Sequence, residues 1–382
     1  MNSSSESGLT GPVWSAVYVG VAAATLPAVL PVMVGVMADD LGFGTIRAGY
    51  VASANMAGIG VGSILCLALT RRWSWTALII VGAIVMIGTN LLTMQHADYS
   101  YFMLMRLLSG LGEGVIAGIC YAAMGQSQVP ARASAFYAAG QGLVGAVGMG
   151  IMPSIVAAAG WPWLFVFVSI LALPAFFLAK SIGTIQPRPA QKRGGKRRVM
   201  SWKAAYALIS ILIYFVGMSA IWAFLERIGH AKGLDTVHLS IALSASAVGN
   251  MVGSLAVGVV AHRLSTVAGL VTGFLVLIAG LLGLVALDEW QAFLVSAVLF
   301  FFSWGFYFPF QFRLLARVDD ERSVSGIMPA ITSSGLTIGP AVGGILLVAG
   351  GAGSVCAFGL AAVVASLVST LHINARSKRA EE

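Results

Sequence analysis

Two residues of opposite charge, Arg106 and Glu113, lie inside an apolar run that extends from Tyr101 to Met124. A charged side chain at the centre of a membrane helix costs roughly 2.5–3.5 kcal/mol on insertion scales. A chain that keeps two such groups there either neutralises them against each other or turns them toward water. Burial disfavours the charged form of a carboxyl group, the property that a proton carrier needs. We therefore predict proton coupling through Glu113 and Arg106; the alternative is an ion pair that only fixes helix packing.

The composition is that of a membrane protein. Hydrophobic residues make up 58% of the chain and charged residues 9%, with a mean hydropathy of +0.91, whereas a soluble domain has about 25% charged residues. Cys66, Cys120 and Cys356 fall inside apolar segments without paired spacing, so we expect small buried side chains and neither a disulfide nor a metal site. The net charge of +8 is distributed as membrane topology requires and does not indicate nucleic acid.

Apolar runs of about 20 residues, the length of a helix that crosses a bilayer, recur along the whole chain. Only helices satisfy the backbone in such a pattern, so we predict an all-α membrane protein with twelve transmembrane helices in two six-helix halves. The expected spans are 13–37, 46–69, 74–95, 100–126, 133–158 and 162–181, and then 203–227, 238–261, 267–287, 291–315, 323–348 and 352–373. The predicted halves are residues 1–181 and 203–382, joined by a basic linker at 182–202.

Lysine and arginine side chains fix the predicted orientation, because cytoplasmic loops carry an excess of them. With both termini inside, the outer loops hold only Arg47, Arg227 and Lys232, and the remaining basic residues, apart from Arg106 inside a span, fall on the inner side. This places both termini in the cytoplasm of a multi-pass protein, which we expect in the cytoplasmic (inner) membrane as a monomer.

The two halves echo each other, since Asn55-Met56 with Gly58 corresponds to Asn250-Met251 with Gly253. Arg106 followed by Gly110, Gly112 and Gly114 resembles the fourth-helix motif of major facilitator superfamily transporters. Leu26-Pro27 through Asp40-Leu41-Gly42 and Gly49 resembles the family's first external loop. The resemblance covers nearly the whole chain and implies a twelve-helix carrier that rocks its two halves around a midplane site.

The chain also departs from the family pattern at two places. The loop between spans two and three keeps Arg71 and Arg72 but lacks the usual Asp and Gly. In the family this loop forms a charged contact between helices; here we expect the arginines to contact a phosphate or a carbonyl instead. Span five is rich in glycine and lacks the Gly-Pro of drug/proton exporters, which favours import slightly.

In this family the first, fourth, seventh and tenth helices line the cavity. The resemblance therefore implies candidates for substrate binding on these helices: Tyr18, Arg106, Tyr121, Trp222, Trp304, Tyr307 and Gln311. Polar or aromatic residues inside other spans are further candidates: Tyr137, Gln141, Asn55 and Asn250. For the amides a hydrogen bond between helices is the alternative, and for the aromatic residues core packing. Glu226 and Arg227 are expected to form an outer gate with Arg47 or Asp39, and Arg71 and Arg72 an inner one.

No nucleotide-binding or nucleophile motif is present, and the histidines lack metal-ligand spacing, so we expect no enzyme activity, no cofactor and no metal. The predicted partners are a small-molecule substrate, protons and the lipid bilayer. The main hypothesis is a proton-coupled secondary transporter, a symporter of an organic anion or amphipathic metabolite, with a monocarboxylate held by Arg106 as one option. A drug or metabolite exporter working as a proton antiporter, an uncoupled facilitator and, remotely, a non-transporting receptor are the alternatives.

Overall fold

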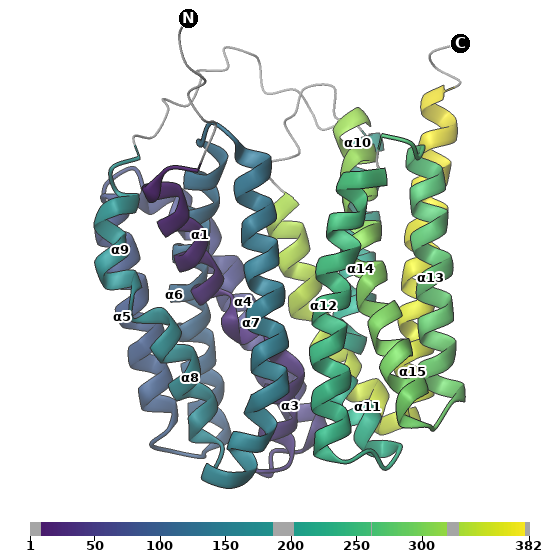
Figure 1. The fold of residues 1–382 in the computed structure, drawn as a ribbon, viewed down its shortest axis with the longest axis horizontal. Helices are drawn as coiled ribbons and strands as arrows, with labels where there is room; N and C mark the ends of the chain where they lie inside the picture. The colour runs from purple at the N-terminus through teal and green to yellow at the C-terminus, as the bar shows by residue number, and fades with distance from the viewer. Residues whose placement is uncertain (1–8, 186–201, 261, 319–327, 379–382) are drawn as a thin grey trace, which may run out of the picture.

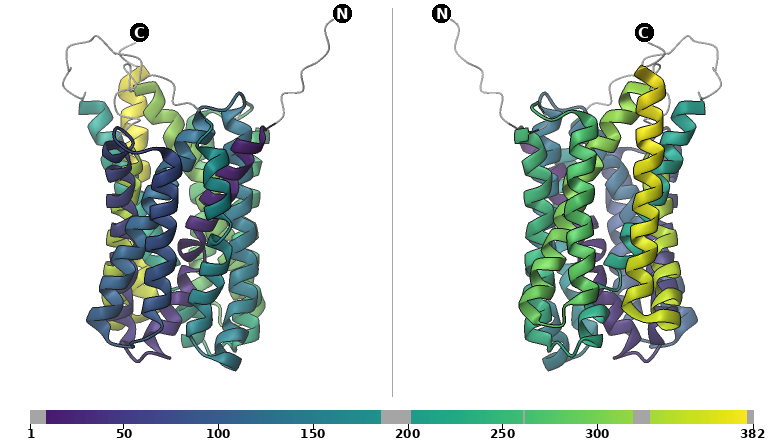
Figure 2. Two further views of the ribbon diagram at one scale, coloured as in Figure 1. Left: turned by 90° about the vertical axis from the view of Figure 1, so that its left-hand side faces the viewer. Right: turned by 90° about the vertical axis from the view of Figure 1, so that its right-hand side faces the viewer.

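The computed structural model of the protein describes residues 9–185, 202–260, 262–318 and 328–378. Most of the predicted linker, residues 186–201, and the basic residues Arg322 and Arg379 therefore lie outside the described residues. The described chain is helical, and the helices run side by side in two groups (Figures 1 and 2). We use N-terminal half for α1–α9 and C-terminal half for α10–α15.

Every predicted span contains helix. The N-terminal half consists of α1 (Gly11–Ala23), α2 (Thr25–Ala28), α3 (Leu30–Ala38), α4 (Gly44–Leu69), α5 (Trp75–Thr93), α6 (Tyr99–Gly125), α7 (Pro130–Ala159), α8 (Pro162–Ala172) and α9 (Ala175–Ile182). The C-terminal half consists of α10 (Trp202–Trp222), α11 (Leu225–Ala231), α12 (Thr236–Val260), α13 (Thr266–Ala286), α14 (Trp290–Val318) and α15 (Met328–Lys378). Among the described residues, ten helices are long and apolar enough to cross a membrane, so the count of twelve spans stays a prediction.

Breaks within single spans, and one helix that covers two spans, explain why the described helices do not match the predicted spans one to one. The first span is divided at Ala24 and Val29, where Pro27 and Pro31 interrupt regular hydrogen bonding, as the sequence predicts. In α15 the backbone leaves the helical region at Gly350 and Gly351, so its two arms cover the last two predicted spans. Short polar residues begin the intervening helices: Asp98 accepts a hydrogen bond from the Tyr101 amide at 2.9 Å at the start of α6.

The internal repeat is visible in the packing of α4 on α6 and of α12 on α14. Asn55 Nδ2 donates to the Arg106 carbonyl at 3.2 Å, and Asn250 Nδ2 donates to the Phe301 carbonyl at 3.1 Å, each 51 residues further along the chain. A Cβ atom added at Gly110 or Gly305 would collide with the carbonyl oxygen of Asn55 or Asn250, respectively. The same close approach of two helices, built from the same residue types, therefore occurs once in each half.

The two halves meet through α4 against α15 and α7 against α12. The beginning of α1 and the end of α15 lie at one end of the molecule, and α3 and α11 lie at the other (Figure 1). The first of these is the cytoplasmic end by the positive-inside rule. Near the outer end of α4, Gly49 lies against the Pro340 backbone, and Gly145 of α7 contacts Ala247 of α12.

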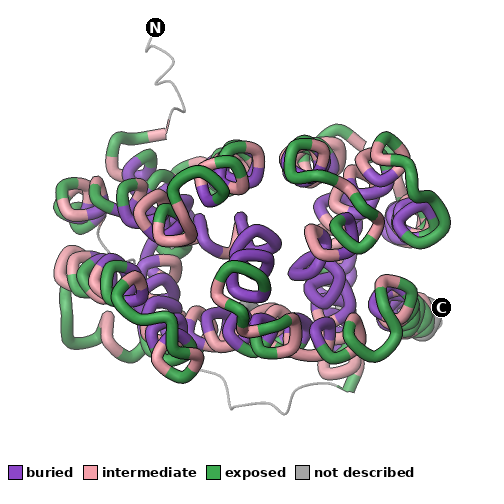
Figure 3. The backbone as a smooth tube through the Cα atoms, turned by 90° about the horizontal axis from the view of Figure 1, so that it is seen from below, coloured by how far each residue is buried: buried purple, intermediate pink, exposed green. Residues whose placement is uncertain are grey.

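The outside of the bundle is apolar. Phe177 is 84% exposed, and Leu67, Val259 and Leu143 are also largely exposed. Viewed along the bundle, the buried segments gather toward the inside of each half and exposed segments toward the perimeter (Figure 3). A perimeter of this kind suits a lipid solvent, whereas the polar groups that carry function are found inside.

Candidate functional site

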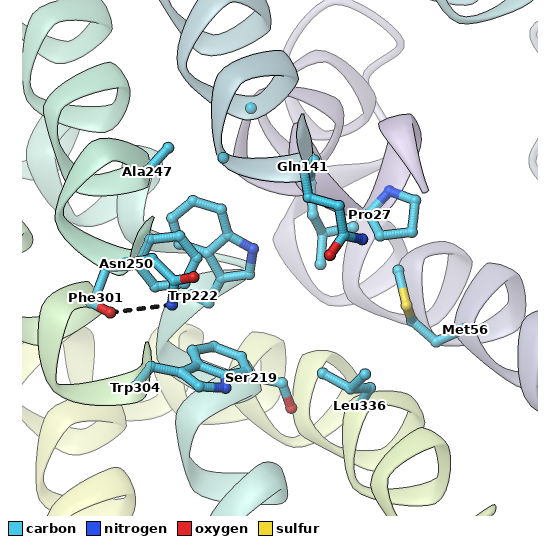
Figure 4. A pocket seen from close by; sticks show the side chains of 14 residues that line it. Pro27, Met56, Gln141, Ser219, Trp222, Ala247, Asn250, Phe301, Trp304 and Leu336 are labelled. Atoms are coloured by element: carbon cyan, nitrogen blue, oxygen red, sulfur yellow. Dashed lines mark hydrogen bonds between the residues drawn. The ribbon is translucent and has the colours of Figure 1, made fainter. Parts of the chain in front are cut away.

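A cavity of about 200 Å³ lies between the two halves (Figure 4). The N-terminal half contributes side chains from its first, second and fifth spans, and the C-terminal half contributes side chains from four helices. The lining residues are Pro27, Ala28, Leu30, Met56, Gln141, Gly142, Gly145, Ser219, Trp222, Ala247, Asn250, Phe301, Trp304 and Leu336. A cavity shared in this way is where a solute can contact both halves of the bundle.

Three aromatic rings build the wall of the cavity on the C-terminal side. Trp222 of α10 stacks on Phe301 of α14, with ring centroids 4.0 Å apart and an interplanar angle of 12°. Trp304, one turn further along α14, meets Phe301 edge-on at 5.5 Å and 83°. Offset stacking and edge-to-face contacts are the favoured arrangements of aromatic pairs, so the wall is rigid before any solute binds.

The polar groups of the cavity are neutral. Asn250 uses Nδ2 on the Phe301 carbonyl, and Ser219 Oγ donates to the Phe215 carbonyl at 2.7 Å. The amide of Gln141 points into the space between Pro27, Met56 and Trp222 (Figure 4), and its side chain also contacts Tyr137 one turn earlier on α7. Among the described residues that line the cavity, none carries a charge.

Glu113 lies elsewhere, in the interior of the N-terminal half. Its side chain is 1% exposed, and Ser109 Oγ donates to Oε1 at 2.8 Å from one turn earlier on α6. Asn55 Nδ2 of α4 lies 3.4 Å from both carboxylate oxygens. The groups that hold this carboxylate are thus neutral side chains on two helices.

Arg106 is fully buried and points away from Glu113, toward α5 and α8. Its Nη2 donates to Thr93 Oγ1 at 2.7 Å, and the guanidinium lies over the ring of Phe165, 4.5 Å from the centroid. Within the described chain, no ion pair joins Arg106 to Glu113, and Nε and Nη1 of Arg106 have no hydrogen-bond partner. The guanidinium is therefore held by one hydroxyl, a longer contact with the Thr89 carbonyl and aromatic faces.

The structure places both ionisable residues away from the cavity, so their roles in binding and coupling stay predictions. Arg106, Gly110 and Glu113 do share one face of α6, but that face is turned to α4 and α5, and neither charged residue lines the cavity of Figure 4. The spacing along one helix identifies residues on a common face, whereas the helix neighbouring that face depends on tertiary packing.

The other predicted binding residues divide into two groups. Gln141, Trp222, Trp304 and Asn250 line the cavity together. The remaining residues have other neighbours: Tyr18 donates to the Leu171 carbonyl, Tyr121 meets Tyr137, Tyr307 stacks on Tyr214, Gln311 donates to Ser366, and Asn55 bonds Glu113. For this second group a role in binding stays a prediction.

An ion pair connects the two halves at the outer end. Arg227 Nη1 of α11 lies 2.7 Å from Asp39 Oδ2 at the end of α3. Arg47, the other outer residue expected near Glu226 and Arg227, lies over the Tyr99 ring at 5.2 Å. Glu226 accepts a hydrogen bond from His230 Nε2 at 2.9 Å within α11, and this bond raises the pKa of His230 above its ordinary value. At the cytoplasmic end, Arg71 and Arg72 are exposed after α4.

Several residues that contact the ionisable groups or line the cavity were not predicted from the sequence. Ser109 and Thr93 hold the two buried ionisable groups, and Phe301, Met56 and Leu336 line the cavity. A signal existed for two of these: Ser109 is one helical turn before Glu113, and Phe301 is one turn before Trp304. Met56 and Leu336 lie on the second and eleventh spans, which the family resemblance does not place at the cavity, and their apolar side chains give no separate signal.

Comparisons with known proteins agree with this architecture. The model of the Major Facilitator Superfamily matches residues 15–328. The structure of the human organic anion transporter MFSD10 (TETRAN) is similar at a TM-score of 0.68 and 13% sequence identity, over 94% of this chain and 98% of that one. A bacterial homologue of the human lysosomal transporter Spinster, in an inward-facing conformation, is similar at 0.62 and 13%, over 96% of both chains. No curated protein matches the sequence.

Proposed function

Because the chain belongs to the major facilitator superfamily, we propose that it is a secondary active transporter that couples a small organic solute to protons through Glu113. The observation that carries the proton coupling is a carboxyl group buried in the N-terminal half and held by Ser109 and Asn55 without an ion-pair partner within 4 Å in the described chain. The central cavity is the proposed solute site, and import by symport in the cytoplasmic membrane is the proposed direction and location.

Opposing influences act on the Glu113 side chain. Burial away from water favours the neutral acid, whereas the hydroxyl of Ser109, the amide of Asn55 and the positive charge of Arg106 favour the carboxylate. A lone buried charge is costly, and a neutral acid would lose part of the stabilisation that these donors give. Glu113 is therefore the acidic group of the described chain best placed to gain and lose a proton inside the membrane.

Helix α4 links this carboxyl group to the solute cavity. Asn55 contacts Glu113, and the next residue, Met56, lines the cavity. The same helix packs on α15 of the other half, where Gly49 lies against Pro340. A proton added to Glu113 weakens its interaction with the donor Asn55, which changes how α4 is held at the surface that moves during alternating access.

The contacts between the halves describe a transporter that is closed on its outer side. They include the Asp39–Arg227 ion pair and the packing of Gly49 on Pro340, both near the outer end. Alternating access requires that these contacts break and that contacts form at the cytoplasmic end. The structure thus supports the inward-facing member of the proposed cycle.

The proposal is tested in proteoliposomes loaded with a pH-sensitive dye. A panel of uncharged, anionic and cationic solutes is added in turn, and the signal of protein-free liposomes is subtracted. We expect at least one solute to acidify the lumen with the native protein and with Glu289→Gln, which removes an exposed outer carboxylate. Glu113→Gln should abolish acidification but retain exchange of labelled for unlabelled solute, because exchange needs no net proton movement.

Retained exchange shows that the Glu113→Gln variant is folded and binds solute. If that variant acidifies the lumen as fast as the native protein does, Glu113 is not the coupling group. If no solute in the panel moves protons with the native protein, proton coupling itself is wrong and an uncoupled facilitator takes its place.

A further inference from the structure

Among the described residues, none that lines the central cavity carries a charge with which to bind an ion. Its polar lining consists of Gln141, Asn250 and Ser219. Arg106, which begins the fourth-helix motif, is not among the lining residues; its guanidinium contacts Thr93 and Phe165 on α5 and α8, helices that pack within the N-terminal half. Given the proposed transport function, we propose that this cavity selects an uncharged solute with a single aromatic ring and a polar group at the edge of that ring.

The size of the cavity limits the solute. Its volume is about 200 Å³, and an apolar protein cavity of about 150 Å³ accommodates benzene. Drug-sized ligands occupy pockets of about 300–1,000 Å³. One six-membered ring with a short substituent therefore matches the volume between the lining side chains in this conformation.

The wall offers an aromatic surface on one side. Trp222 has one face covered by Phe301, at 4.0 Å and nearly parallel, and Trp222 itself lines the cavity. Trp304 stands almost perpendicular to Phe301, so the indoles and the phenyl ring form a corner. A flat ring gains contact with such a corner without reordering it, because the ring contacts exist before binding.

One polar group, the amide of Gln141, lies across the cavity from that corner (Figure 4). The amide of Gln141 enters the cavity from the N-terminal half. In the C-terminal half, Asn250 Nδ2 already donates to the Phe301 carbonyl and Ser219 Oγ to the Phe215 carbonyl. A primary amide such as Gln141 both donates and accepts. A substituent that also donates and accepts, such as a carboxamide or hydroxyl, therefore suits this edge of the cavity.

Ions of either sign fit the cavity less well. A carboxylate would enter with no cationic partner among the lining residues, so the free-energy cost of removing it from water would not be offset. An ammonium group would gain a cation–π contact with an indole, but this attraction is smaller than the penalty for removing the ion from water. The option of a monocarboxylate held by Arg106 is thus disfavoured by the geometry.

Three probes of nearly equal size test the inference: benzamide, benzoate and benzylammonium. Tritiated benzamide is bound to purified protein in detergent at pH 7.5, and the three unlabelled compounds compete with it. We expect the dissociation constant of benzamide to be at least about tenfold below those of the two ions, since neither ion has a partner charge. Absent benzamide binding, or benzoate binding as tightly as benzamide, would overturn the proposal.

A variant that gains affinity for a probe tests the cavity without the ambiguity of a variant that fails to fold. Gln141→Glu places a carboxylate in the cavity with little change in shape, and we expect it to bind benzylammonium at least about tenfold more tightly than the native protein does, since an ion pair then forms. The control, Gln128→Glu, adds the same charge near the start of α7 in the cytoplasmic loop. Unchanged benzylammonium affinity in Gln141→Glu would mean that the probe binds elsewhere.

The two proposals can fail independently. If benzamide binds selectively and exchanges across the membrane without moving protons, the solute class stands and the coupling through Glu113 falls. If a different solute moves protons in a Glu113-dependent way while benzamide neither binds nor competes, the coupling stands and the solute class falls.

Discussion

Replacing Arg227 by Gln should shift the transporter toward a conformation with an open outer end. The replaced ion pair joins α11 to α3 across the two halves at 2.7 Å, with side chains of Arg227 and Asp39 that are 23% and 58% exposed. Exposed pairs of this kind contribute about 0.2–1 kcal/mol, so the ratio of open to closed molecules should rise roughly 1.4- to 5-fold. A larger change in this ratio would require a buried ion pair, and the exposed side chains of Arg227 and Asp39 exclude that.

Pulsed electron paramagnetic resonance measures this ratio from the distance between two spin labels. The labels are placed at Ala97→Cys and Gly353→Cys, in outer segments of opposite halves; Cys66, Cys120 and Cys356 are buried. The effect should disappear at about 1 M salt, where the Debye length is about 3 Å.

The matched control is Lys232→Gln. Lys232 also forms an outer ion pair, with Asp288 at 2.8 Å, but both residues belong to the C-terminal half. Its loss should leave the distance distribution unchanged. A latch between the halves is refuted if Arg227→Gln leaves the distribution as it was, or if Lys232→Gln shifts it equally.

Three further predictions concern packing, pH and the buried guanidinium. Gly110→Ala and Gly305→Ala should each lower the free energy of unfolding by about 1–3 kcal/mol, because a Cβ would overlap an asparagine carbonyl. Thermal unfolding in detergent measures this, and the control Gly88→Ala, where the added Cβ meets open space, should leave the unfolding temperature unchanged. Since the hydrogen bond to Glu226 raises the pKa of His230, its stabilisation is complete below the ordinary value of about 6.5 and is lost as pH rises through the raised value. His230→Gln should therefore flatten the pH dependence of the unfolding temperature, and an equal flattening by His96→Gln would contradict this. Thr93→Val removes the one side-chain hydroxyl that Arg106 bonds and should cost about 1.5–3 kcal/mol, with recovery in Thr93→Ser; a Thr93→Val protein as stable as the native one would argue against the contact.

The positions of the helices were predictable because the physical signal is local. A run of apolar residues long enough to cross a bilayer admits only helix, and residues such as Asp98 begin a helix by accepting a backbone hydrogen bond. The bend at Pro27 and Pro31 follows from the chemistry of proline in the same way. Of the two outer residues proposed as partners for Glu226 and Arg227, Asp39 lies against Arg227, whereas Arg47 lies over the Tyr99 ring; the gating role itself stays a prediction.

The composition of the site was harder to predict because it depends on which helices become neighbours. The spacing of Arg106 and Glu113 places them on one face of α6 but does not say that α5 supplies Thr93 to one and α4 supplies Asn55 to the other. The cavity wall likewise needs α15, which contributes the apolar side chain of Leu336. Long-range packing, rather than local pattern, decides these contacts.

The repeat explains why protons and solute are assigned to different places. The asparagine contacts of the two halves align residue 55 with 250 and residue 106 with 301, an offset of 195 in both cases. Arg106 thus corresponds to Phe301, and Glu113, by the same offset, to Phe308. The N-terminal copy keeps ionisable groups sealed among neutral donors, whereas the C-terminal copy has rings there, and Phe301 supports Trp222 at the cavity wall.

This divergence of the copies bears on the mechanism. A proton site and a solute site in one cavity would compete directly, because a solute could screen or contact the carboxyl group. Here Glu113 and the cavity are joined only through packed elements such as α4, where Asn55 faces one site and Met56 the other. In the proposed mechanism, coupling passes through the position of α4 against α15, so a substitution that loosens this packing should separate solute exchange from proton movement while both sites keep their residues.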